Sequence, residues 1–194
     1  MARGNDQQRP ATGIPVRGPM NGPDADEFPE HRRYARHLES LAAAPGAGAC
    51  AETEAEVVVA VLRDPDRVMA ESAVVTHLDR RAVRLLADEE FAAWARAMAA
   101  ALAGRPFPER RLREWSLLKA VTRGEPWSAE ELTAASDWCQ RTAVRLLTSY
   151  EALTLLATDA RTRRVRNTAA ERLRRGTAFR TGGELTTSRR SPGG

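Results

Sequence analysis

The chain has 194 residues, of which 42% are hydrophobic, 29% charged and 5% aromatic, and its mean hydropathy is −0.47. This length suits one domain. No apolar stretch approaches the roughly 18 residues that a membrane-spanning helix needs, which excludes a membrane bundle. The net charge of +4 rests almost wholly on arginine, because Lys119 is the only lysine. Frequent alanine and scarce aromatic residues favour helix.

The two ends of the chain differ in composition from its middle. Residues 1–26 are rich in proline and glycine, and residues 176–194 are basic, polar and glycine-rich. We therefore expect a disordered arm and a disordered tail on either side of a helical domain at 27–175. The N-terminus lacks the apolar segment of a secretory signal, and the two cysteines form no CxxC pair. We expect a cytoplasmic protein.

Turn residues divide the middle of the chain into short helices. Asp64-Pro65, Asp88-Glu-Glu and Ser128-Ala-Glu-Glu131 each have the form of a helix N-terminus, the last as a capping box. Residues 57–62 could be a strand by residue preference, but nothing nearby can pair with them, so a helix is favoured. The sequence predicts an all-α domain. The sequence predicts helices that begin near residues 64, 88 and 128. It predicts further helices at about 29–44, 52–63, 108–122, 149–157 and 160–175.

Two segments show a helical repeat of apolar residues, which predicts faces that pack in the core. The clearer one spans 130–147, and Cys139 lies on its apolar face, so we expect that thiol to be a small buried hydrophobe. In 66–86 the pattern is interrupted by Asp79. The apolar residues are Leu132, Ala135, Cys139, Thr142 or Ala143, and Leu146 in the first segment, and Val68, Val75, Leu78, Ala82 and Leu86 in the second.

The four tryptophans all lie between residues 90 and 140, at positions 94, 115, 127 and 138. We expect them to form the centre of the core, with Trp127 packing as an N-terminal staple beside Ser128. The alternative is that one of them serves as a binding hot spot.

Short helices joined by turns that contain Asp or Pro predict helix pairs stacked as a solenoid. Residues 64–78 resemble the turn and second helix of a HEAT-type repeat. Residues 153–173 resemble the end of a first helix, a turn and a second helix, whereas residues 88–130 do not fit the period. The residues of the second segment that match in register are Val165, Ala169, Ala170 and Leu173. The resemblance implies a scaffold that binds other proteins on a concave face lined by second helices. A minority of such proteins bind DNA, including HEAT-like alkylpurine DNA glycosylases.

The sequence contains no recognisable catalytic or metal-binding motif. His31 and His37 lie on different faces of a helix and His77 is far away, so no zinc pair forms. No nucleophile has an evident base. We therefore assign no catalytic, cofactor-binding or metal-binding residue. An enzyme of unfamiliar type is a further alternative, which a deep pocket with convergent polar groups near Trp115 or Trp138 would favour.

Basic charge is concentrated at the C-terminal end. Residues 161–194 have a net charge of +8, and residues 1–160 have a net charge of −4. On a helical wheel, arginines surround a narrow apolar stripe made of Val165, Ala169 and Leu173. Such an array is typical of a solvated terminal cap, of a surface for an acidic protein, or of a phosphate-binding surface. A membrane is disfavoured because the stripe is narrow and lacks aromatics. The candidate binding residues are Arg161, Arg163, Arg164, Arg166, Arg172, Arg174 and Arg175.

These observations together favour a cytoplasmic protein-interaction or regulatory module without catalytic activity or cofactor. Its expected partner is a protein, with an acidic surface as one possibility. The alternative is a helical domain that binds nucleic acid through its arginine-rich last helix.

Overall fold

The computed structural model describes residues 29–44 and 50–184, and their side chains as far as residue 176. This part of the chain forms helices and no strand, which confirms the predicted all-α class. Residues 57–62 belong to the second helix and its C-cap. The helices are α1 (Pro29–Ala43), α2 (Ala51–Val61), α3 (Arg67–Leu85), α4 (Phe91–Ala101), α5 (Pro106–Arg123), α6 (Ala129–Ala134), α7 (Asp137–Leu146), α8 (Tyr150–Asp159) and α9 (Arg163–Glu184).

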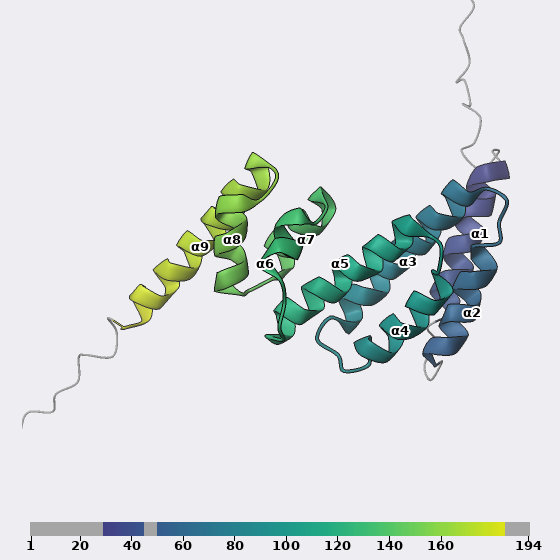
Figure 1. Ribbon diagram of the computed structural model, residues 1–194, viewed down its shortest axis with the longest axis horizontal. Helices are drawn as coiled ribbons and strands as arrows, with labels where there is room; N and C mark the ends of the chain where they lie inside the picture. Colours follow the sequence, from purple (N-terminus) through teal and green to yellow (C-terminus); the bar gives the residue numbers. More distant parts are fainter. Residues whose placement is uncertain (1–28, 45–49, 185–194) are drawn as a thin grey trace, which may run out of the picture.

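The helices form two rows, because helices that are two apart in the chain pack side by side. One row consists of α1, α3, α5, α7 and α9, and in the other α2 packs on α4 and α6 on α8. The stack is elongated, with α1 near one end and α9 at the other (Figure 1). Stacked helix pairs were predicted, and the structure contains them.

The spacing of the helix pairs is irregular. The second helices α3, α5, α7 and α9 begin at residues 67, 106, 137 and 163, so successive spacings shrink from 39 to 31 to 26 residues. Residues 88–130 hold the packed pair α4–α5 even though they do not fit the period. The helices therefore pack as pairs along the stack, although the number of residues from one pair to the next is not constant.

The second row is interrupted in its middle. Helices α4 and α6 do not pack side by side, and α5 and α7 provide the principal packing between α1–α5 and α6–α9. We call this boundary the junction.

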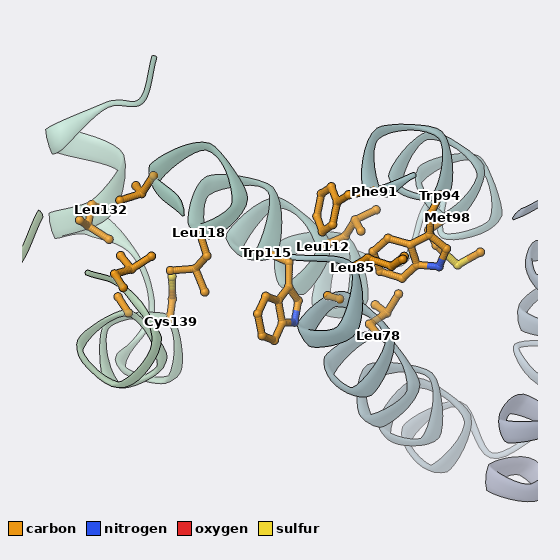
Figure 2. Close-up of a cluster of buried hydrophobic side chains, with 14 of the residues drawn as sticks. Leu78, Leu85, Phe91, Trp94, Met98, Leu112, Trp115, Leu118, Leu132 and Cys139 are labelled. Atoms are coloured by element: carbon orange, nitrogen blue, oxygen red, sulfur yellow. The ribbon is translucent and has the colours of Figure 1, made fainter. Parts of the chain in front are cut away.

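A single apolar core runs across the junction. Figure 2 shows it passing from Trp94 and Met98 of α4 through Trp115 and Leu118 of α5 to Cys139 of α7. Trp94 and Trp115 are 2% and 1% exposed, and they lie in the core as predicted. The other two tryptophans are only partly buried and pack at its edge.

The predicted core faces are largely confirmed, with one error. Leu132, Cys139 and Ala143 are fully buried, as is Leu78. Val68 is 78% exposed, so its assignment to the core was wrong. It lies in the first turn of α3 on a side that faces solvent, whereas Ala70 in the same turn is fully buried. Asp79, which interrupts the pattern, accepts hydrogen bonds from the Trp115 indole at 2.8 Å and from Arg111 at 2.6 Å.

One predicted helix start differs in detail from the structure, and another is confirmed. The cap of α3 is Asp66, whose side chain accepts from the Met69 amide, whereas Asp64 accepts from the Asp66 amide. Asp64 thus shapes the turn before the helix instead of capping it. Ser128 caps α6 as predicted and accepts from the Glu131 amide at 3.2 Å.

The apolar face at 130–147 belongs to two helices. The break falls at Ser136, whose hydroxyl caps α7 by accepting from the Cys139 amide. The fully buried amide of Gln140 donates to the carbonyls of Leu132 and Thr133 at the end of α6. These bonds satisfy carbonyls that a continuous helix would have used, so α6 and α7 form separate helices on the same core.

The last helix extends beyond its predicted end at residue 175. It passes through Gly176 and ends at Glu184. Gly176 is not among the glycines with a positive φ, and a helical glycine costs only about 1 kcal/mol relative to alanine, so the helix can continue through it. The predicted arm at 1–26 and the tail residues 185–194 lie outside the described residues.

Candidate binding groove at the junction

A groove opens at the junction where the second row is interrupted. It consists of two adjoining hollows of about 590 and 330 Å³, both bordered by Arg110, Glu114, Ser136 and Arg161. The larger lies between α5 and α6, and the smaller lies beside the start of α7. A hollow of this size is in the range of sites that hold a small ligand or several partner side chains. We call the pair the junction groove.

The larger hollow has an apolar lining. Leu117 and Ala120 contribute from α5, and Trp127 contributes from the loop after it. That loop begins at Gly124, whose φ of +68° ends α5 in the left-handed region that glycine tolerates. The turn brings Trp127 back to the hollow that Leu117 and Ala120 line. In the smaller hollow, Phe107 is 49% exposed and lies with Trp138.

Paired polar groups connect the two sides of the groove. The buried Glu114 carboxylate accepts from the Ser136 amide at 3.0 Å and lies 3.8 Å from the Arg111 guanidinium. Arg111 also lies 3.5 Å above the ring of Trp138, which meets Trp115 edge to face at 5.3 Å. These groups are engaged with one another and fix the position of α7 against α5.

Free positive charge lies on the α5 side of the groove. Arg110 and Arg113 are exposed, and their guanidinium groups make no hydrogen bond or ion pair with any other described residue. Arg161 stands at the far side, 3.9 Å from Asp137, with both side chains about half exposed. Glu114 and Glu131 are the acidic residues that line the larger hollow, and of these two only Glu131 of α6 is exposed. The groove therefore combines an apolar lining with two available cations.

The seven arginines predicted as a binding array do not form one surface. Arg161 borders the junction groove. Arg166 donates to the carbonyl of Ala160 at 2.6 Å, and Arg172 donates to that of Val144 at 2.5 Å, so both guanidinium groups hold α9 against the stack. Of the seven arginines, the other four, Arg163, Arg164, Arg174 and Arg175, are exposed on α9.

The four exposed arginines in the described part of α9, up to residue 176, fall into two groups. Arg163 and Arg164 pair with no described side chain. Arg174 and Arg175 both engage Glu171 one turn earlier, with Arg175 at 3.0 Å. The hydrogen bond and charge of Arg174, with those of Arg175, hold the pKa of Glu171 below its usual range. One carboxylate thus partly neutralises the C-terminal part of the array.

A buried polar cluster joins α2, α3 and α4 away from the groove. The Glu54 carboxylate is 1% exposed and binds His77 Nε2 and the Trp94 indole, both at 2.8 Å, and Arg81 at 3.2 Å. Burial raises the pKa of Glu54, but the hydrogen bonds from His77 and Trp94 and the charges of His77 and Arg81 lower it more. Both oxygens of the Glu54 carboxylate are thus occupied within the fold, and no buried side-chain nitrogen or oxygen of the described residues lacks a hydrogen-bond partner.

The other two histidines have separate positions. His37 Nε2 lies 2.8 Å from Asp64, and His31 is exposed. Among the described residues, no group of three or more His, Cys, Asp or Glu side chains could hold a metal ion. The helices of the described part are too short or too polar to cross a membrane.

Sequence reasoning missed the functional candidates on α5. Arg110 and Arg113 resemble any charged outer face of a helix, and no spacing marks them as part of a groove. We predicted Trp127 as an N-terminal staple and gave a hot spot as the alternative for one unspecified tryptophan, and Trp127 lies partly buried beside the apolar lining. The missing information is the gap between α4 and α6, because that gap leaves this face of α5 open.

Comparison with known proteins finds no match to this chain among family models, curated proteins or solved structures.

Proposed function

We propose that this chain is a cytoplasmic protein-interaction module of the HEAT-like, helix-pair type, and that it binds its partner in the junction groove. The observation that carries the proposal is the groove itself, in which partly buried aromatic rings adjoin free arginines at a break in the stack. Aromatic and arginine side chains contribute most of the energy at many protein interfaces.

The smaller hollow brings polar groups together beside Trp138, as the enzyme alternative requires, but the pairing of its buried acid favours binding over a reaction. Glu114 is the buried acid of the groove, and it is occupied by the Ser136 amide and Arg111. Cys139 lies under the groove in the core, where burial and the nearby Glu114 raise the pKa of its thiol to about 12. Such a thiol stays protonated and is a poor nucleophile.

Site-specific photo-cross-linking tests the proposal. A benzoylphenylalanine in place of Ala134, an exposed residue of the groove, should capture a partner protein in cells that make the chain. The same group in place of Ala100, an exposed residue of α4, is the matched control. Equal capture from both positions, or none from Ala134, would contradict the assignment of the groove.

A second candidate function is nucleic-acid binding through α9. The observation that favours it is the exposed group Arg163, Arg164, Arg174 and Arg175 on a helix whose other face is packed on α8. Phosphate contacts of this kind weaken steeply with salt. Binding of a DNA or RNA duplex that weakens on changing Arg163 and Arg174 to Ala, with a shallower salt slope, would support this function. No binding at low salt would remove it.

A further inference from the structure

We infer that the occupant of the junction groove is an acidic segment of a partner protein that carries a large apolar side chain. This inference rests on the proposed function and adds the chemistry of the partner. Charge complementarity with the α5 side of the groove and the apolar lining beside it determine that chemistry.

The α5 side selects negative charge. Arg110 and Arg113 are three residues apart on one helix, so their side chains emerge on the same face about 5–6 Å apart at Cβ. Neither guanidinium has a partner among the described residues, and both border the larger hollow. Two carboxylates one helical turn apart on a partner would match this spacing and satisfy both cations.

The α6 side determines how the segment lies. Glu131 is exposed there and repels carboxylates, while Ala134 and Ala135 offer small apolar surfaces. The acidic side of the segment therefore lies over Arg110 and Arg113 of α5, and its apolar side lies over the apolar lining and α6. A uniformly acidic segment would place charge against Glu131 and against the apolar lining, so it fits less well.

The apolar lining also distinguishes the groove from the arginines of α9. Phosphates need cations but no apolar surface, and the described side chains of α9 expose arginines and other polar groups but no large apolar residue. In the groove, Leu117, Ala120 and Trp127 would lose contact with water when a leucine or phenylalanine covers them. A protein segment supplies both carboxylates and an apolar anchor.

Fluorescence anisotropy with a synthetic peptide tests the inference. The probe is a fluorescein-labelled helical peptide with glutamates one turn apart on one side, and leucine and phenylalanine on the other. Two control peptides replace the glutamates with glutamine or the apolar pair with serine. We expect the probe to bind and each control to bind about tenfold or more weakly, because each lacks one of the two contacts.

Two matched charge reversals locate the binding. Arg110→Glu with Arg113→Glu should raise the Kd of the probe about tenfold or more. Arg163→Glu with Arg164→Glu changes the net charge by the same amount on α9 and should change the Kd less than about twofold. Equal effects of the two double variants would overturn the inference, because bulk charge or α9 would then attract the peptide.

A variant that leaves the net charge unchanged tests the role of the groove independently of charge. Ala134→Trp places a large ring in the groove from an exposed position, and circular dichroism checks that the helices are retained. We expect loss of probe binding. If the wild-type chain does not bind the probe, the acidic-segment inference is overturned, whereas protein capture at Ala134 would still support the proposed function. Self-association that Ala134→Trp abolishes would assign the groove to a second copy and also overturn the inference.

Discussion

Glu54 is the residue on which the packing of α2, α3 and α4 converges. Its carboxylate accepts from three side chains that belong to the other two helices. Removal of one partner from a buried charged network leaves the others unpaired in a poorly solvated site. The packing of these three helices therefore depends on the carboxylate of Glu54.

Replacement of Glu54 by leucine should lower the free energy of unfolding by about 3 kcal/mol. The physical reason is that His77, Arg81 and the Trp94 indole would lose their shared acceptor. Urea denaturation followed by circular dichroism measures the change. Glu56→Leu on the exposed side of α2 is the control, and it should stay within about 0.5 kcal/mol of the wild type. Equal effects of the two variants would refute the role of the cluster.

Acid should remove the contribution of Glu54. Its pKa in the folded chain lies below its ordinary value of 4.5, so the unfolded chain binds the proton first as the pH falls. The stabilisation by the Glu54 carboxylate is full above pH 4.5. It is lost as the pH falls through the lower pKa that Glu54 has in the folded chain. The difference in unfolding free energy between the wild type and Glu54→Gln should therefore shrink below pH 4.5. A difference that stays constant on acidification would contradict this account.

The two cysteines should react very differently. Cys50 is exposed, whereas Cys139 is buried and the pKa of its thiol is raised to about 12. Iodoacetamide at mildly alkaline pH should modify Cys50 in the folded chain and Cys139 only after urea unfolds it. Mass spectrometry of the digested protein measures both. Rapid labelling of Cys139 in the native chain would show that the core at the junction opens readily.

At the residue scale, the sequence predicts which side chains are buried better than it predicts which side chains bind one another. The spacing of Glu54, Val58 and Val61 at i, i+4 and i+7 places the carboxylate on the apolar side of its helix. Its partners His77 and Trp94 are 23 and 40 residues away in the chain. No local spacing predicts that these side chains meet.

At the scale of single elements, the errors arise from helix ends. The apolar face of 130–147 is continuous across two helices because both pack on the same core, so periodicity alone cannot reveal the break at Ser136. Similarly, Gly176 resembles a stop signal, yet it lies inside α9. A glycine ends a helix where it adopts a positive φ, as Gly124 does.

Alanine substitution at these two glycines should have opposite effects on stability. Gly176→Ala meets nothing within 4 Å and removes a flexible residue from a helix, so it should stabilise α9 by up to about 1 kcal/mol. Gly124→Ala forces a side chain into the left-handed region and should destabilise the chain by about 1 kcal/mol. Amide hydrogen exchange and thermal unfolding measure the two effects. If Gly176→Ala left exchange in α9 unchanged or faster, the continuation of that helix to Glu184 would be contradicted.

At the scale of the whole molecule, the stack of helix pairs follows from local signals, but its interruption does not. Short helices and turn residues predict pairing, because each short helix must bury one face on a neighbour. The gap between α4 and α6 depends on the shortness of α6 and on the turn after Gly124, which together leave one face of α5 open. The junction groove is a consequence of that arrangement, so a composition or motif search cannot find it.

The junction groove is the docking surface that we propose, and the tryptophan indoles report on it directly. Trp127 lines the groove, whereas the Trp94 indole is committed to Glu54 in the core. In a ¹H–¹⁵N NMR titration with the acidic probe peptide, the Trp127 indole signal should shift, followed by the backbone amides of Arg110 and Arg113, while the Trp94 signal stays in place. Shifts confined to the amides of Arg163 and Arg164, with the Trp127 signal unchanged, would contradict the claim.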